Sequence, residues 1–343
     1  MPIPHPPASL RVMTRNVYIG ADLSPVFHAI NADQLIAGVD TVFRSVQATD
    51  FPARAEALAG EIAGADPHLV SLQEVALWRS RTPADLDHTP NATDVEFDFL
   101  EILLDRLAAR GKHYEAVATA IGGDYEAPRR TAVGGLQDIR LTDRDVLLAR
   151  TDLPEEEFSV AHAQADRYEA HVQITSGPLS GTVVPRGWVA ADVTVHGHTI
   201  RVVGTHLEPV DPAVQMAQGR ELLDGPLDTT LPRVLAADLN SAADGVGALP
   251  GRTDTRTHHD ILAAGFTDAW TAAHDAEPGF TCCRPADLRD GMTNLGQRID
   301  YVLFSGALTV LATNRVGEAP GALTPSGLWP SDHAGVWSVL QVH

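Results

Sequence analysis

Short apolar runs recur along the chain and predict β-strands. Residues 9–17, SLRVMTRNV, and residues 68–75, HLVSLQEV, form the first two runs. Residues 187–207 alternate between apolar and polar on both sides of His196-Gly197, a pattern typical of a β-hairpin. Further strands are predicted at 113–120, 138–150, 233–241, 266–270, 297–304 and 307–316, and in the closing run after His333.

Helical spacing of apolar residues is less frequent. It predicts helices over 53–65, over 94–111 where Gly111 ends the pattern, and over 211–224. A loop is predicted over 78–93, and an acidic, irregular stretch over 151–187. Strands joined by hairpins, without regular strand–helix–strand alternation, indicate an α/β (α+β) sandwich that is mostly antiparallel rather than a doubly wound parallel sheet.

Polar residues with metal-binding or acid–base side chains stand at the ends of these runs or beside them. They are Asn16, Glu74, His206, Asp238, Asn240, Asp300, Asp332 and His333. Each has an ordinary explanation when taken singly, as a turn cap, a structural histidine or a partner for an arginine. Together they supply the carboxylates, amides and imidazoles of a phosphoester site, and oxygen donors of this kind suit Mg²⁺ or Ca²⁺.

Two pairs within this set have informative spacing. Asp238 and Asn240 are two residues apart, so they share one side of an extended segment. Adjacent residues of a regular strand point to opposite faces, so Asp332 and His333 can share a pocket only if the backbone is irregular there. We therefore expect them on the lead-in to the closing strand.

Composition and charge narrow the classes of function. The chain has 343 residues, of which 44% are hydrophobic and 20% charged, as in folded globular proteins. No run of about 18 to 20 apolar residues predicts a membrane span. The net charge is −20 and Lys112 is the only lysine, which disfavours binding to long nucleic acids. A phosphate bound here needs local positive charge, which a divalent metal can supply.

Two features leave alternatives open. The opening MPIPHPPASL has neither the basic nor the apolar segment of a signal peptide, so the location stays open between a secreted mature form and the cytoplasm. Cys282 and Cys283 are adjacent, and we expect two buried free thiols rather than a strained disulfide.

Six short motifs carry a resemblance to a known family. TRN, SLQE, GTHL, ADLNS, RIDYVL and SDH, in this order, resemble the endonuclease/exonuclease/phosphatase superfamily with the DNase I-like fold. The resemblance runs from about residue 9 to the end of the chain. It implies a four-layer sandwich, in which two mostly antiparallel sheets are flanked by helices and the site lies at one end. The expected organisation is a Pro-rich lead over 1–8, a single domain over 9–343, and a monomer.

The resemblance also implies a metal site. Asn16 and Glu74 would be ligands, with Asp332 close by, and the cation would be Mg²⁺, with Mn²⁺ or Ca²⁺ as alternatives. Asp238 and Asn240 would offer a possible second site.

Catalytic roles follow from the same resemblance. His333 would be the general base for an attacking water, and Asp300 would orient its imidazole. Asp238 and Asn240 would position the nucleophile and a phosphate oxygen. His206 would donate to a non-bridging oxygen or assist the leaving group.

The chain departs from the family pattern at two points. Arg15 stands where many members have an aromatic residue, and Asp22 is either a further acid or, as we favour, a helix cap. A phosphate-contacting residue in the middle third has no clear counterpart. The candidates for it are Tyr125, Arg129, Arg130 and Arg144.

The motifs identify a reaction class and leave the substrate open. The opening MTRNVYIGADL is more similar to secreted bacterial members, including the sphingomyelinase-like branch, than to the abasic-site DNA repair branch. We therefore expect a metal-dependent phosphodiesterase or phosphatase for a small or lipid-derived phosphoester. A non-specific endonuclease is the first alternative, and a non-catalytic phosphate-binding scaffold is the second.

Overall fold

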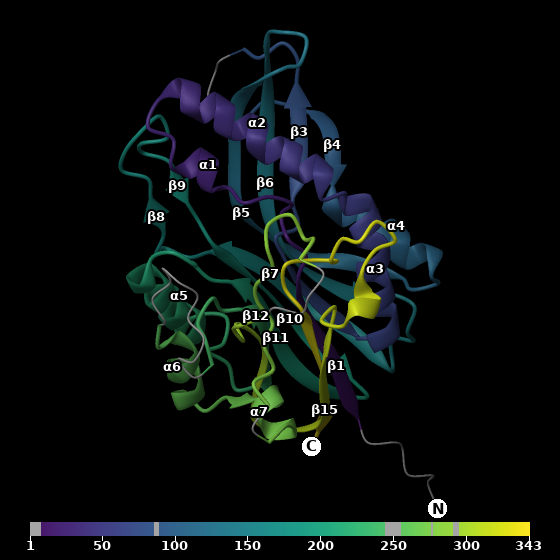
Figure 1. Ribbon diagram of the computed structural model, residues 1–343. Helices are drawn as coiled ribbons and strands as arrows, with labels where there is room; N and C mark the ends of the chain where they lie inside the picture. Colours follow the sequence, from purple (N-terminus) through teal and green to yellow (C-terminus); the bar gives the residue numbers. More distant parts are fainter. Residues whose placement is uncertain (1–7, 86–88, 244–254, 276, 291–294) are drawn as a thin grey trace, which may run out of the picture.

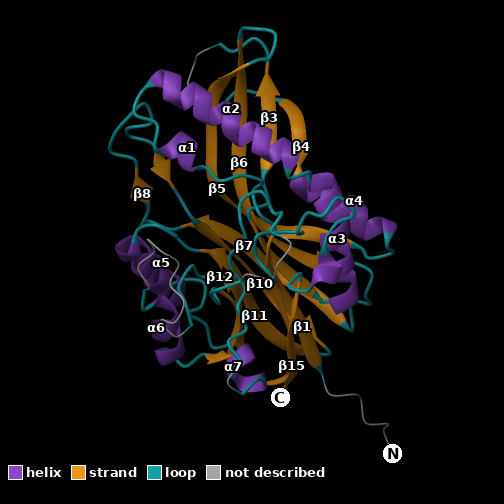
Figure 2. Cartoon of the chain, viewed as in Figure 1, coloured by secondary structure: helices purple, strands orange, loops and turns teal. Residues whose placement is uncertain are grey.

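Strands paired into two large sheets dominate the computed structural model, which describes residues 8–85, 89–243, 255–275, 277–290 and 295–343 (Figures 1 and 2). The expected lead over residues 1–8 therefore lies outside the described residues except for Ala8.

The larger sheet has the strand order β15-β16-β1-β2-β6-β3-β4, and β5 also pairs with β6. Its strands are β1 (Ser9–Asn16), β2 (Leu69–Gln73), β3 (Leu77–Arg81), β4 (Asp94–Asp98), β5 (Tyr114–Arg130), β6 (Leu136–Arg150), β15 (Leu308–Val316) and β16 (Gly335–Val342).

The smaller sheet has the order β13-β14-β12-β11-β10-β7. Its strands are β7 (Phe158–Arg167), β10 (Gly187–Val195), β11 (His198–His206), β12 (Arg233–Asp238), β13 (Thr267–Asp268) and β14 (Asp300–Ser305). A separate pair consists of β8 (Val172–Gln173) and β9 (Val183–Val184).

Helices cover the outer faces of both sheets (Figure 2). They are α1 (Ser24–Phe27), α2 (Ala32–Ala48), α3 (Phe51–Ala65), α4 (Phe99–Ala109), α5 (Pro212–Asp224), α6 (Thr257–Ala263), α7 (Ala269–Ala273) and the 3₁₀ helix η1 (Pro320–Ala322). Helices α2, α3 and α4 pack on the larger sheet, whereas α5 and α6 pack on the smaller one. The expected sandwich of two mostly antiparallel sheets flanked by helices is confirmed.

One parallel pair in each sheet fixes where the functional residues lie. Strands β1 and β2 are parallel with Asn16 opposite Gln73, and β11 and β12 are parallel with His206 opposite Asp238. Parallel neighbours end at the same edge of a sheet. The residues that follow these four strands therefore collect at one end of the sandwich.

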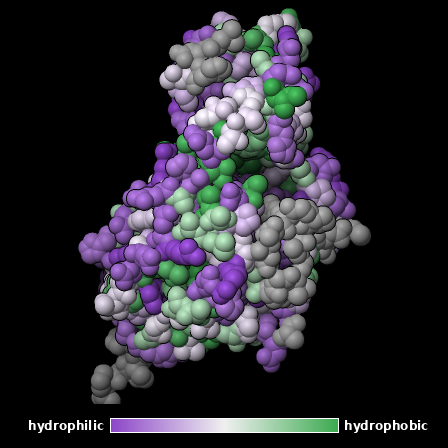
Figure 3. Space-filling view, turned by 90° about the vertical axis from the view of Figure 1, so that its left-hand side faces the viewer, coloured by the Kyte–Doolittle hydropathy of each residue, from purple (hydrophilic) through white to green (hydrophobic). Residues whose placement is uncertain are grey.

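Apolar side chains fill the space between the sheets and the space beneath the helices. Val12, Leu69 and Leu147 of the larger sheet belong to the same buried cluster as Val202 and Val234 of the smaller one. At the surface, Figure 3 shows mostly polar side chains, with hydrophobic ones gathered at mid-height on the side of α1 and β8. Among the described residues, no helix combines the length and apolar character needed to cross a membrane.

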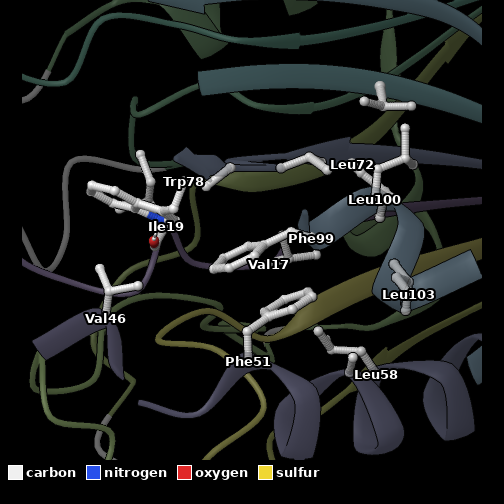
Figure 4. Close-up of a cluster of buried hydrophobic side chains, with 14 of the residues drawn as sticks. Val17, Ile19, Val46, Phe51, Leu58, Leu72, Trp78, Phe99, Leu100 and Leu103 are labelled. Carbon is white, nitrogen blue, oxygen red and sulfur yellow. Dashed lines mark hydrogen bonds between the residues drawn. The ribbon is translucent and has the colours of Figure 1, made fainter. Parts of the chain in front are cut away.

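A second core packs directly under the segment that follows β1. The rings of Phe51 and Phe99 stack with centroids 3.6 Å apart, close to Val17 (Figure 4). Trp78 donates its indole N–H to the carbonyl of Ile19 at 3.1 Å. This packing fixes the backbone that leads into the functional end of the molecule.

Several predicted boundaries are wrong. Residues 94–98 form strand β4, because the Asp98 side chain accepts the amide N–H groups of Leu100 and Glu101 and so begins the helix only at Phe99. The predicted loop over 78–93 contains most of β3, and the irregular stretch over 151–187 contains β7, which pairs with β10. Of the strand predicted at 266–270, only two residues pair before α7 begins.

The predicted hairpin is confirmed, and one long helix escaped prediction. Strands β10 and β11 pair around His196-Gly197, whose φ angles are +47° and +85°. Helix α2 buries Leu35, Val39 and Val46 on one face, and the side chain of Asn31 caps its first turn by accepting the Gln34 amide.

Arg54 of α3 ties distant loops together. It is fully buried and donates to the backbone carbonyls of Thr49, Val17, Tyr18 and Pro330 at 2.7 to 3.2 Å. Burial lowers its pKa to about 10, which still leaves it charged at neutral pH. Arg54 thus holds the loop after β1 against the segment that precedes β16.

Replacing Arg54 with Met should reduce the free energy of unfolding by at least about 3 kcal/mol, because buried carbonyls lose their donors. Urea unfolding measures this change. Arg44→Met, on the exposed face of α2, is the control and should stay within about 0.5 kcal/mol of the wild type. Equal stability of the Arg54 variant and this control would contradict the role given to Arg54.

Candidate active site

The strand ends bring the predicted residues to one end of the sandwich. Asn16 ends β1, Glu74 follows β2, His206 ends β11, and Asp238 ends β12 opposite Asp300, the first residue of β14. Glu74 and Asn240 both adopt left-handed backbone conformations, with φ of +60° and +49°. This conformation is costly for a residue with a side chain, and it tends to occur at functional sites.

Asn16 links the acids of the two sheets. Its amide nitrogen donates to Glu74 Oε1 at 3.0 Å and to Asp238 Oδ2 at 3.1 Å. Its amide oxygen accepts the N–H of Tyr18, and the second oxygen of Glu74 accepts the N–H of Ile19. One lone pair of the Asn16 oxygen remains for a cation, so Asn16 both orients the two carboxylates and offers a donor.

His333 and Asp300 form a buried pair. His333 Nδ1 lies 2.8 Å from Asp300 Oδ2, and the two residues are 5% and 1% exposed. Asp238 Oδ2 lies farther from the same nitrogen, at 3.8 Å. A carboxylate at Nδ1 keeps the proton on that nitrogen and directs the basic lone pair to Nε2.

Three buried arginines hold the segment before β16. Arg15 and Arg284 both donate to the carbonyl of His333, at 2.7 and 3.2 Å, and Arg54 donates to Pro330. Ser331 accepts the N–H of His333 and donates to the carbonyl of Asn16. Asp332 and His333 thus precede the regular strand, as predicted.

Arg186 is a partly buried cation within the site. Its Nη1 lies 3.1 Å from His206 Nδ1 and 3.7 Å from Asp143 Oδ2. An arginine can only donate, so His206 Nδ1 accepts and the His206 proton lies on Nε2. That nitrogen faces Asp238 Oδ2 at 3.6 Å.

Asp143 and Asp145 are further acids that the sequence analysis missed. Both lie on the face of β6 that also carries Leu147 and Ala149, and these two residues belong to the core between the sheets. The signal was present in DRDVLLAR, where the inward-facing positions of the strand change from apolar to acidic toward the site. Arg186 was missed because it stands at the end of a stretch taken as irregular.

The acids raise one another's pKa. Burial and then the charge of Asp300 raise the pKa of Asp238 to about 7. Burial, followed by the charge of Glu74, raises the pKa of Asp332 to about 6. Burial by itself lowers the pKa of His333, but Asp300, Asp332 and Asp238 together outweigh burial and raise it to about 10.

The middle-third candidates make other contacts. Tyr125 donates to the carbonyl of Val183, and Arg144 binds the carbonyl of Val75 and the carboxylate of Asp98. Arg129 and Arg130 pair with Asp40 and Asp33 at α2.

Other side chains named from the sequence also have defined places. Arg15 is fully buried and pairs with Glu61. Asp22 accepts the N–H of Ser24, but the N-cap of α1 is Leu23 and no side chain caps this helix, so the expected cap at Asp22 is wrong. The two adjacent cysteines, expected as free thiols, are instead paired as a disulfide across a cis peptide bond.

The donor set fits a hard divalent cation. A cavity of about 280 Å³ is lined by Glu74, Asp143, Asp332 and Arg186. Asp238 and Asp300 lie buried beside it within 4.8 Å of His333. Carboxylate and amide oxygens are the ligands of Mg²⁺ and Ca²⁺, and a bound cation would offset the repulsion that raises these pKa values.

Comparison with known families identifies one match. The profile of the Endonuclease/Exonuclease/phosphatase family matches residues 31–333. The chain belongs to the endonuclease/exonuclease/phosphatase family. A search of curated proteins finds no match.

Solved structures of this family have the same fold. The family member from Bacteroides vulgatus is 15% identical, with 98% of this chain and 99% of that chain covered and a TM-score of 0.56. The member from Beutenbergia cavernae is 23% identical, with coverage of 98% and 72% and a TM-score of 0.54. A mannosyl-6-phosphatase from Bacteroides thetaiotaomicron is 15% identical, with coverage of 96% and 99% and a TM-score of 0.54.

Replacing Asp300 with Asn should lower the pKa of His333 by about one to three units, because the imidazolium loses its nearest negative partner. Nitrogen-15 NMR titration of the histidine rings in metal-free protein measures the change. Asp33→Asn, on the exposed start of α2, is the control and should leave the His333 titration unchanged. An unaltered His333 pKa in the Asp300 variant would rule out the pairing as its cause.

Proposed function

We propose that this protein is a divalent-metal-dependent phosphoesterase, most simply a phosphodiesterase for a small or lipid-derived phosphoester. The observation that carries the proposal is the His333–Asp300 pair beside a cavity lined by Glu74, Asp332 and Arg186. A base with an orienting carboxylate, a set of oxygen donors and a guanidinium group are the parts that hydrolysis of a phosphoester requires.

Glu74, Asn16 and Asp332 would hold the cation, which we take to be Mg²⁺. Asp238 and Asn240 are candidates for a second one. When bound, the cation supplies positive charge to the phosphate and to the departing oxygen.

Water activation is assigned to His333. With Nδ1 bonded to Asp300, Nε2 takes a proton from the attacking water as the new oxygen–phosphorus bond forms and the bond to the departing oxygen breaks. Without a cation the raised pKa keeps His333 protonated at neutral pH. Positive charge near the acids lowers that pKa and frees the base.

Phosphate binding is assigned to Arg186, His206 and Asn240. Because His206 Nδ1 accepts from Arg186, the ring is neutral and Nε2 can donate a hydrogen bond. Giving up that proton would leave an imidazolate, so the geometry favours contact with a non-bridging oxygen over protonation of the leaving group. The departing oxygen then takes its proton from solvent.

Two alternatives are weighed against this proposal. Mannosyl-6-phosphatase activity of one structural neighbour is a precedent for small phosphoesters in this fold, whereas the net charge of −20 disfavours an endonuclease. A non-catalytic scaffold has no need of the His333–Asp300 pair.

The assay that tests the proposal uses chelator-treated protein. Bis(p-nitrophenyl) phosphate should be hydrolysed after addition of Mg²⁺ or Mn²⁺ and should not be hydrolysed in the presence of chelator. Plasmid DNA, sphingomyelin and glycerophosphodiesters are assayed in parallel. If no substrate is hydrolysed with any divalent metal, the non-catalytic scaffold is the remaining alternative. Rapid plasmid nicking at catalytic enzyme concentrations would favour the endonuclease.

His333→Ala and Asp238→Ala should each lower kcat at least about 100-fold with Mg²⁺ present, on the scale of losing a general base or an electrostatic partner. Asp33→Asn again serves as the control, and thermal unfolding checks that each variant is folded. Near-normal turnover in a folded variant would refute the role given to that residue.

A further inference from the structure

A second cavity lies beside the candidate active site, and its walls are mostly apolar. It has a volume of about 380 Å³ and is lined by Val26, Leu35, Val39, Trp78, Leu141 and Leu179, among others. This volume falls within the range of small-molecule sites. Figure 3 shows hydrophobic side chains around a hollow at mid-height on this side of the molecule.

The two cavities share a wall. Leu23 lines both of them, and Asp22 lines the active-site cavity directly before it. Tyr125 lines the apolar cavity, and Gly122, three residues before it, lies next to Asp143 of the active-site cavity. A Cβ atom on Gly122 would lie 3.3 Å from Asp143 Oδ2.

The position of Tyr125 depends on a close approach to glycine. A Cβ atom on Gly123 would lie 2.2 Å from the Tyr125 ring, so this ring position requires glycine there. The Tyr125 hydroxyl donates to the carbonyl of Val183 at 3.1 Å and fixes the ring in the wall of the apolar cavity. Among the described lining residues, Leu23 is the one that the two cavities share.

The apolar cavity also has a closely packed roof. Gly177, with φ of +72°, approaches the α1–α2 connection so closely that a Cβ atom would lie 2.3 Å from the carbonyl oxygen of Ala29. This contact places Leu179 against the core beneath α2. At the rim, Asp124 is paired with Arg140, and Glu126, which also lines the cavity, accepts the N–H groups of Asn91 and Ala92. Both carboxylates therefore have partners within the protein, and the surface that remains for a ligand is mainly apolar.

We propose that this cavity binds an uncharged alkyl or aryl substituent of the phosphoester whose phosphate lies in the active site. The inference rests on the proposed function and adds the class of substrate to it. Burial of each methylene group can raise affinity by up to roughly fourfold. The logarithm of kcat/KM should therefore rise in proportion to the length of an apolar substituent until the cavity is filled.

A series of p-nitrophenyl alkyl phosphates, from methyl to octyl, tests this selectivity with Mg²⁺ and below the concentration at which the esters aggregate. We expect kcat/KM to rise at least about 20-fold from the methyl to the octyl ester. Equal kcat/KM values for all chain lengths would overturn the inference.

Two variants block the cavity in different ways. Val26→Trp fills it, and Leu179→Asp places a charge in its roof. Each should reduce the octyl-to-methyl ratio of kcat/KM to less than about 3-fold, consistent with loss of apolar burial. Ile30→Trp, at an exposed position just beyond α1, is the matched control and should keep the wild-type ratio. A wild-type ratio in both folded variants would contradict the assignment.

A binding measurement separates this inference from the proposed function. Calorimetric titration with octylphosphonate and methylphosphonate requires no turnover. Tighter binding of octylphosphonate that Val26→Trp abolishes would support the cavity even if no phosphoester were hydrolysed. Equal binding of the two phosphonates by an enzyme that hydrolyses the methyl ester would refute the cavity and leave the proposed function intact.

Discussion

Carboxylates that are shielded from water repel one another, and in the described part of this chain six of them lie together at one end of the sandwich. Asp145, Asp238 and Asp300 are buried, and Glu74, Asp143 and Asp332 are partly buried. Charged groups in such a place require compensating charge or protons. In the described part of the chain, Arg186 and His333 supply positive charge directly within the cluster. The negative charge still exceeds the positive charge there, and the pKa values of Asp143, Asp238 and Asp332 are raised as a result.

The rest of the structure maintains this concentration of charge. One parallel pair in each sheet brings four strand ends together, and left-handed residues at Glu74 and Asn240 turn the chain beside those ends. Arg15, Arg54 and Arg284 bind backbone carbonyls and fix the segment over 330–333. These buried arginines thus position the segment that carries Asp332 and His333, and the repulsion among the acids persists.

Much of the fold and of the candidate site could be predicted from the sequence, because both depend on local patterns. Apolar runs gave the central strands, and the polar residues that end them, such as His206 and Asp238, meet because parallel strands end together. Helix α2 was missed although its apolar stripe is plain in the structure. Residues 94–98 were assigned to a helix because periodicity alone does not show that Asp98 begins it.

Residues whose roles depend on pairing across the sheets escaped prediction. Arg186 precedes β10 and reaches His206 at the end of β11, and nothing in the local sequence marks that contact. Asp143 and Asp145 lie on a face of β6 whose other residues belong to the core. Their acidity indicates a functional role only once this face is known to extend to the site.

Calorimetric titration of Mg²⁺ into metal-free protein at pH 6.5, in buffers with different heats of ionisation, tests the central claim most directly. Because the acids and His333 hold protons that a cation would displace, the account predicts saturable binding accompanied by release of protons, weakened by Glu74→Gln. Absence of binding at millimolar Mg²⁺, or binding without any change in bound protons, would contradict it.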